Sequence, residues 1–178
     1  GYAVQGHFFS LNDIENGILR RNKTPPYHLR KMFSSNDKRL DYVLKDAEPR
    51  IHFALNCGSK SCPPIKNFTA EAVREELRIA AMAFAEMDDN CAVDSAKKEL
   101  KISKILSWYR SDFGSSDKEV ASTVLQWTRG QKKEDLQKLL DAGTFKIRHF
   151  DYDWGTNASK FKTYNPDVLK TESKCSIM

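Results

Sequence analysis

One block of the chain, residues 50–65 (RIHFALNCGSKSCPPI), limits its fold more than any other. Residues 51–55 are apolar except for His52, and their length and composition predict a short buried strand. Small and polar residues follow, and Pro63 and Pro64 end the segment because proline cannot continue a regular strand or helix. A buried strand that leads into a tight, thiol-bearing turn often places reactive groups at the edge of a sheet.

The rest of the chain predicts an α+β fold of one domain, with a small central sheet packed by several helices. A chain of 178 residues, 40% hydrophobic and 30% charged, can bury one sizeable core. Periodicity and capping residues predict a strand or extended arm at 2–9, helices beginning at Ser10, Thr69, Ser103 and Asp117, a hairpin at 91–102, a helix ending at Gly143 and a strand at 144–150. Residues 1–158 form the domain in this interpretation, and 159–178 form a polar tail.

The charge pattern argues against nucleic acid as a partner. The net charge is +5, but 29 basic residues interleave with 24 acidic ones, whereas nucleic-acid-binding domains gather Lys and Arg on one face. The chain contains no apolar run of about 18 residues and does not open with a secretory leader, so we expect no transmembrane helix and no secretory signal within it, while a leader or further domains could lie upstream. Because Gly1 stands where Met would begin a chain, we expect this to be the C-terminal part of a longer intracellular protein.

The number and spacing of the cysteines limit the redox and metal chemistry that the chain can perform. The chain has four: Cys57, Cys62, Cys91 and Cys175. Without a secretory signal we expect a reducing compartment and no disulfides. Cys57 and Cys62 are separated by four residues, which is wider than the spacing of zinc knuckles, and no second ligand pair follows them. We therefore predict no metal and no cofactor.

His52, Cys57, Cys62 and Asp153 are the candidate catalytic residues. His52 is either a core histidine or a general base, because imidazole titrates near neutral pH. Asp153 follows the last predicted strand and could orient that base, as could Asn157. Turn amides and Lys60 could lower the pKa of Cys57, although both thiols could equally be small packing residues.

Two further sets of side chains, one aromatic and one acidic, are not expected to be catalytic. Trp108, Tyr109 and Phe113 are interpreted as core aromatics, and Asp112 is assigned no function. Glu15 lies beside the apolar stripe of the first helix and is expected to be a partly buried carboxylate paired with His52 or Arg20.

Four ordered segments resemble the domain-of-unknown-function 547 family: residues 10–20 (SLNDIENGILR), 52–64 (HFALNCGSKSCPP), 100–113 (LKISKILSWYRSDF) and 152–157 (YDWGTN). The last segment has Gly155 and Thr156 where the family usually has Ser and Leu. The family pattern also includes an upstream helix with an Asn-x-Tyr-Asn-Ala motif, which this sequence lacks. The resemblance implies an adaptor role as readily as catalysis, since some eukaryotic members carry the domain behind signalling or glutaredoxin-like domains.

The last four residues, Cys175-Ser176-Ile177-Met178, fit the C-a-a-X prenylation pattern, and a terminal Met favours farnesyl. One farnesyl chain anchors a protein weakly, so a second signal is expected, and the tail lysines Lys160, Lys162, Lys170 and Lys174 supply a diffuse basic one. The predicted partners are a prenyltransferase, other proteins and the cytosolic face of a membrane.

Two functions follow. The first is a prenylated interaction or scaffolding domain of a larger signalling protein. The second is a thiol- or His-dependent hydrolase or transferase with a layout like that of transglutaminase-like and papain-like folds, in which neighbouring strands supply His and Asp. An open cleft that holds His52 within about 4 Å of a cysteine sulfur or of the Asp153 carboxylate would favour the enzyme. Burial of all these groups in apolar surroundings would favour the scaffold.

Overall fold

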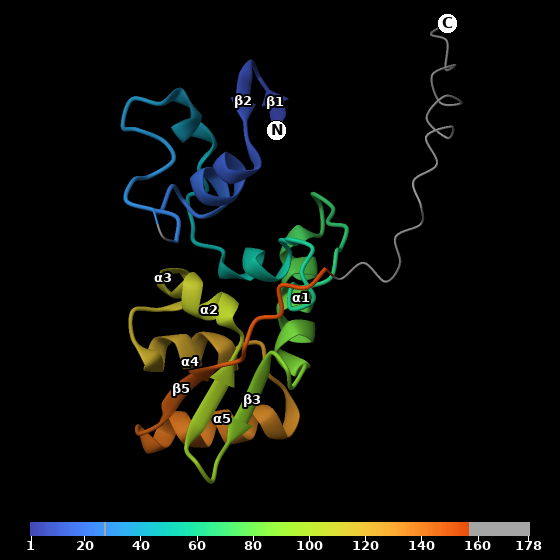
Figure 1. Cartoon of the computed structure of the whole chain (residues 1–178), viewed down its shortest axis with the longest axis vertical. Coiled ribbons are helices and arrows are strands. Elements are labelled where there is room, and N and C mark those ends of the chain that lie inside the picture. The colour runs from blue at the N-terminus through green and yellow to red at the C-terminus, as the bar shows by residue number, and fades with distance from the viewer. Residues whose placement is uncertain (27, 157–178) are drawn as a thin grey trace, which may run out of the picture.

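The computed structural model describes residues 1–26 and 28–156 and confirms the α+β class (Figure 1). The chain begins with a hairpin in which β1 (Tyr2–Val4) pairs antiparallel with β2 (His7–Phe9). The two loop residues, Gln5 and Gly6, have φ of 47° and 79°, as a two-residue hairpin turn requires. The segment predicted as a strand or arm is therefore a hairpin, and Phe9 at its end is buried.

The first helix, η1 (Asp13–Leu19), has the wide turns of a π-helix. Backbone N–H groups of Arg20 and Asn22 donate to carbonyls five residues earlier, at 3.0 and 2.7 Å. The predicted capping box is confirmed: the Ser10 hydroxyl accepts from the Asp13 N–H at 3.0 Å, and the Asp13 carboxylate accepts from the Ser10 N–H at 2.9 Å. A 3₁₀ helix, η2 (Lys38–Tyr42), packs against η1.

The predicted strand at residues 51–55 is wrong, because this part of the chain forms the 3₁₀ helix η3 (Pro49–Phe53). The carboxylate of Glu48 accepts from the Arg50 N–H at 3.2 Å, and Pro49 is suited to the first turn of a helix. Ile51, His52 and Phe53 are all buried, as they would be in the predicted buried strand, so burial does not separate the two structures. A short apolar run does not distinguish the two structures in sequence.

The predicted amphipathic helix after Thr69 is confirmed as α1 (Val73–Glu86). Its buried face is formed by Leu77, Ala80, Ala81, Phe84 and Ala85. The Thr69 hydroxyl accepts from the Ala72 N–H at 3.3 Å just before the helix. The helix packs against η3 and β3, so it holds η3 in place.

A three-stranded sheet follows, in the order β3-β4-β5. The predicted hairpin is confirmed as β3 (Cys91–Asp94) and β4 (Glu99–Ile102), which are antiparallel. Strand β5 (Lys146–His149) lies parallel to β4, with Leu100 opposite Ile147. The parallel crossover contains α2 (Lys104–Trp108), α3 (Arg110–Phe113), α4 (Asp117–Leu125) and α5 (Gly130–Ala142), which ends at Gly143 as predicted.

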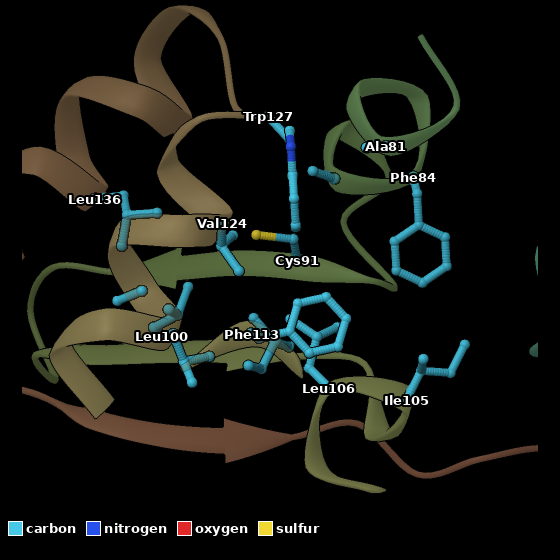
Figure 2. Close-up of a cluster of buried hydrophobic side chains, with 14 of the residues drawn as sticks. Ala81, Phe84, Cys91, Leu100, Ile105, Leu106, Phe113, Val124, Trp127 and Leu136 are labelled. Atoms are coloured by element: carbon cyan, nitrogen blue, oxygen red, sulfur yellow. The ribbon is translucent and has the colours of Figure 1, made fainter. Parts of the chain in front are cut away.

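One hydrophobic core joins η3, α1, the sheet and the crossover helices. Figure 2 shows the part of this core that lies between α1, the sheet and the crossover helices. Phe53 lies near its centre, with its ring 4.5 Å from that of Phe84 and 5.2 Å from that of Trp127. Helix α5 packs against β3 and α4. Within residues 1–26 and 28–156, no helix is long and apolar enough to cross a bilayer. The predicted tail at 159–178 lies outside the described residues.

Candidate functional site

A pocket of about 630 Å³ opens between the N-terminal helix, the turn after η3, the end of α2 and the segment after β5. His52, Cys57 and Cys62 all line it, so the structure brings together three of the four candidate catalytic residues. Most of the remaining wall is apolar or aromatic, and includes Leu11, Ile14, Leu55, Ile105, Trp108, Tyr109, Tyr152 and Trp154. Concave sites of this kind, with a few polar groups on an apolar wall, are typical of ligand-binding pockets.

His52 is bound to a carboxylate, but that carboxylate belongs to Asp112. The Nε2 atom of His52 lies 2.9 Å from Oδ2 of Asp112, and both side chains are buried. The imidazole also stacks on the ring of Tyr109, with 4.2 Å between the ring centroids. These contacts fix the ring from its edge and its face, so its orientation is determined before any ligand arrives.

Three donors hold Asp112 in its ionised form. Burial opposes its charge, but hydrogen bonds from His52, Arg20 and Lys23 outweigh it and hold the pKa of Asp112 far below its usual range. Arg20 Nε lies 2.5 Å from Oδ2 and Lys23 Nζ lies 2.9 Å from Oδ1. An ionised carboxylate only accepts hydrogen bonds, so the proton of the neutral imidazole must sit on Nε2.

The second nitrogen of His52, Nδ1, is therefore the basic one. Burial lowers the pKa of His52, and the hydrogen bond to Asp112 offsets this only in part, so the ring is neutral near pH 7. Among the described residues no group hydrogen-bonds to Nδ1, and none of their fully buried side-chain nitrogens or oxygens lacks a partner. His52 lines the pocket, and because Nε2 is bound to Asp112, Nδ1 is the ring nitrogen left to accept a hydrogen bond from a ligand.

The turn that carries the two cysteines is held by its own side chains. The Asn56 amide accepts from the Gly58 N–H at 2.8 Å and donates to the Pro63 carbonyl at 2.5 Å. Gly58 has φ of 84°, a conformation that glycine adopts without strain. The Cys57 N–H donates to the sulfur of Cys62 at 2.9 Å. The turn therefore folds the two cysteines onto each other.

Cys57 is the more acidic of the two thiols. Its burial opposes ionisation, but hydrogen bonds from Ser59 and Tyr152 outweigh it and lower the pKa of Cys57 to about 7. Ser59 Oγ donates to the Tyr152 oxygen at 2.9 Å, which leaves the Tyr152 hydroxyl proton for Cys57 Sγ at 3.5 Å. Cys62 differs, because burial raises its pKa. Cys57 is thus substantially a thiolate at neutral pH, the form in which a thiol is nucleophilic.

The prediction that Asp153 orients His52 is wrong. The Asp153 carboxylate is 58% exposed, accepts from the Gly155 N–H at 2.8 Å and faces Lys60 Nζ at 3.7 Å. Its backbone has a different role, because its carbonyl accepts from the Ser61 N–H and its N–H donates to the Ser61 hydroxyl at 2.8 Å. Asp153 therefore supports the cysteine turn from outside the pocket. Asn157, the alternative partner, lies outside the described residues.

Neither Asp112 nor Tyr152 was predicted from the sequence as a site residue, and Tyr109 was predicted only as a core aromatic. Tyr109 is half-buried and donates to the Glu15 carboxylate at 2.7 Å, so Glu15 is paired with Tyr109 and not with His52 or Arg20. The sequence held one signal for these two residues. Asp112 and Tyr152 lie in segments 100–113 and 152–157, which are two of the four segments that resemble the family. Neither spacing nor periodicity relates these residues to His52.

The two thiols and His52 line the same pocket without being hydrogen-bonded to each other. In the described part of the chain, no hydrogen bond joins His52 to a cysteine sulfur. Within the same residues, no group of three or more His, Cys, Asp or Glu side chains is placed to hold a metal ion. His52 and the two cysteines share an open pocket, but no contact among the described residues joins His52 to a cysteine sulfur or to the Asp153 carboxylate, and the carboxylate bound to His52 is that of Asp112.

Comparison with known proteins identifies a family for the first part of the chain. Residues 1–85 match the family described as "Protein of unknown function, DUF547", which confirms the resemblance seen in the sequence. The match contains the segments 10–20 and 52–64, and hence His52, Cys57 and Cys62. No curated protein and no solved structure matches the chain.

Proposed function

Since residues 1–85 match the DUF547 family, whose description names no activity, we propose from the pocket itself that this chain is a cysteine-dependent acyl hydrolase or acyltransferase. The observation that carries the proposal is that the Cys57 thiol and the Asp112-bound imidazole of His52 line the same pocket. A nucleophile and a base held by a third group are the common arrangement of nucleophilic catalysis.

The chemistry begins at Cys57. Its thiolate attacks the carbonyl carbon of an acyl donor, a carbon–sulfur bond forms, and a weakly basic leaving group such as a thiolate or phenolate departs with the electron pair of the broken bond. Water, or an amine or alcohol acceptor, then loses a proton to Nδ1 of His52 and attacks the thioester. The carbon–sulfur bond breaks and returns the Cys57 thiolate, and the proton on His52 passes to the departed leaving group.

Asp112 supports this second step. It holds Nε2–H of His52 at 2.9 Å and stabilises the imidazolium that forms when Nδ1 takes a proton. Arg20 and Lys23 keep the carboxylate ionised throughout. Hydrogen bonds between catalytic groups often tighten only when substrate binds, so a direct bond between His52 and Cys57 is not required beforehand. The apolar wall at Leu55, Ile105 and Trp108 favours a donor with an apolar acyl group.

The test is covalent trapping of the acyl group. The full chain is mixed with p-nitrophenyl and thioester donors of apolar acids, and intact and peptide masses are followed over time. We expect an acyl group on Cys57, slow release in the wild type, and no adduct in Cys57→Ser. In His52→Gln the adduct should form and persist, because the base that activates the acceptor is gone. Cys91→Ser is the matched control and should behave as the wild type.

Two outcomes would overturn the proposal. One is the same adduct in Cys57→Ser, and the other is no adduct in a wild-type protein shown to be folded by circular dichroism. In the second case the pocket would serve binding alone, as the interaction-domain hypothesis requires.

A second proposal concerns the C-terminus and is independent of the pocket. The sequence Cys175-Ser176-Ile177-Met178 favours farnesylation of Cys175. Farnesylation would place the domain reversibly on the cytosolic face of a membrane, where it could act on, or bind, protein partners of a signalling assembly.

A further inference from the structure

The two cysteines of the pocket are in direct contact. The Cys57 N–H donates to Cys62 Sγ at 2.9 Å. The Cys62 N–H donates to the Ser59 carbonyl at 3.1 Å, and the Asn56 amide holds the far end of the turn at Pro63. A closed turn of this kind keeps the sulfur atoms together in the reduced protein, in which Cys57 and Cys62 are free thiols.

We propose that Cys57 and Cys62 are a redox-active dithiol, which a peroxide converts into an intramolecular disulfide across the turn. The disulfide forms whether or not the pocket is catalytic. Its effect on activity, the loss of the Cys57 nucleophile, rests on the function proposed above. In a reducing compartment such disulfides are transient and regulatory.

The reaction has two balanced steps. The Cys57 thiolate attacks one peroxide oxygen, the O–O bond breaks, and the leaving hydroxide takes a proton to become water, so that Cys57 becomes a sulfenic acid. Cys62 sulfur then attacks Cys57 sulfur, the S–O bond breaks, and the hydroxyl group leaves with the Cys62 proton as a second water. Two thiols and one hydrogen peroxide give one disulfide and two waters. A cellular dithiol reductant restores both thiols by supplying two electrons and two protons.

The surroundings of the two sulfur atoms indicate that Cys57 reacts with the peroxide first and that Cys62 then attacks Cys57. Cys57 is exposed, and the Tyr152 hydroxyl lies 3.5 Å from its sulfur, a contact that favours its thiolate. Cys62 is half-buried, and its sulfur lies 3.7 Å from the Leu55 carbonyl, an acceptor that keeps the proton on sulfur. Cys91 is buried, and burial raises its pKa to about 11, so it serves as an internal unreactive reference.

The test uses the full chain with Cys175→Ser, so that Cys91 is the only other thiol. The reduced protein receives one equivalent of hydrogen peroxide, free thiols are alkylated, and the protein is digested with trypsin. Lys60 lies between the two cysteines, so trypsin separates them into peptides 51–60 and 61–66. These two peptides should be recovered joined, and they should separate after reduction. Cys91 should be alkylated only after unfolding.

Single substitutions test the roles. Cys62→Ser should stop at the Cys57 sulfenic acid, which dimedone traps, and Cys57→Ser should not react at the same peroxide dose. Phenylarsine oxide, which needs two adjacent thiols, should protect both cysteines from alkylation in the reduced parent and neither in the single variants. A parent protein that accumulates sulfenic or sulfinic acid at Cys57 without the joined peptides would overturn the proposal, as would crosslinking of Cys57 to Cys91. The disulfide is detected by the mass of the joined peptides and not by activity. If the disulfide forms in a protein that shows no acyl transfer, only the acyl-transfer proposal is rejected.

Discussion

At the scale of single residues, the hydroxyl of Tyr152 is, after Ser59, one of the groups that lower the pKa of Cys57. It lies 3.5 Å from Cys57 Sγ, and the Ser59 hydroxyl donates to its oxygen. We predict that Tyr152→Phe raises the pKa of Cys57 from about 7 toward the ordinary thiol value of about 8.5. The measurement is the rate of iodoacetamide alkylation at Cys57 against pH, whose midpoint should move upward.

Tyr109→Phe is the matched control for this prediction. Tyr109 lines the same pocket, but its hydroxyl donates to Glu15 at 2.7 Å and not to a thiol. The Cys57 profile should therefore be that of the wild type. Equal profiles in all three proteins would show that the hydroxyl of Tyr152 does not set the charge of Cys57.

At the scale of secondary-structure elements, Asp112 ties three segments together. It joins Arg20 after η1, His52 in η3 and its own helix α3. Asp112→Ala would leave the buried Arg20 guanidinium without its carboxylate, and we predict a loss of about 3–5 kcal/mol in the free energy of unfolding. Urea unfolding measures this loss, and Asp117→Ala is the control, because its partner Arg110 is largely solvated and its loss should be under about 1 kcal/mol.

The same network makes stability depend on pH in a definite direction. The pKa values of both His52 and Asp112 are lowered by folding, so the unfolded chain takes up protons first as pH falls. The stability that His52 contributes to the folded state is fully present above about pH 6.5 and is lost as the pH falls below that value. The stability that Asp112 contributes is fully present above about pH 4 and is lost as the pH falls below that value. We predict that the stability difference between wild type and Asp112→Asn, large at pH 7, shrinks as pH falls below about 4. A difference that stays constant down to pH 2 would rule out an ionised Asp112.

The π-helix η1 provides a third test at this scale. A Cβ atom at Gly17 would overlap the ring of the buried Phe33. Gly17→Ala should therefore cost about 1–3 kcal/mol of stability through overpacking, despite the higher helix propensity of Ala. Adding Phe33→Leu should relieve the overlap, so that the double variant is more stable than the sum of the two single effects predicts. Additive losses would mean that the overlap is not the cause.

Elements whose apolar residues recur with a clear helical or strand period could be predicted from the sequence. Elements that are fixed by contacts with distant residues could not. The stripe of α1 and the cap at Gly143 follow from local chemistry alone. Helix η3 was predicted as a strand because a run of five residues, apolar except for His52, carries no period, and its packing against α1 decides the outcome. His52, Cys57 and Cys62 share a pocket partly because they share one block of sequence. Asp112, 60 residues from His52, leaves no local signal.

At the scale of the whole molecule, the residues that match the family and the residues that fold together as one unit are not the same. Residues 1–85 supply His52 and both pocket thiols, but Asp112 and Tyr152 come from the rest of the chain. Phe53 packs against Trp127, and the core continues through β3, β4 and α5. We predict that residues 1–85 alone lack a cooperative thermal transition by circular dichroism, whereas residues 1–158 show one. A cooperative transition in the shorter fragment would contradict a shared core.

Attachment to a membrane is the last property of the whole molecule that the sequence predicts. In a eukaryotic cell Cys175 should carry farnesyl, and fractionation should recover part of the protein with membranes, because one chain contributes about 0.8 kcal/mol per buried methylene and binds reversibly. Cys175→Ser should shift all of it to the soluble fraction, and we expect Tm to stay unchanged because a thiol and a hydroxyl differ little in size. Met178→Leu is the matched control, which should exchange farnesyl for geranylgeranyl and hold the protein more firmly on membranes. Labelling with an isoprenoid analogue reads the modification directly, and equal labelling of wild type and Cys175→Ser would exclude Cys175 as its site.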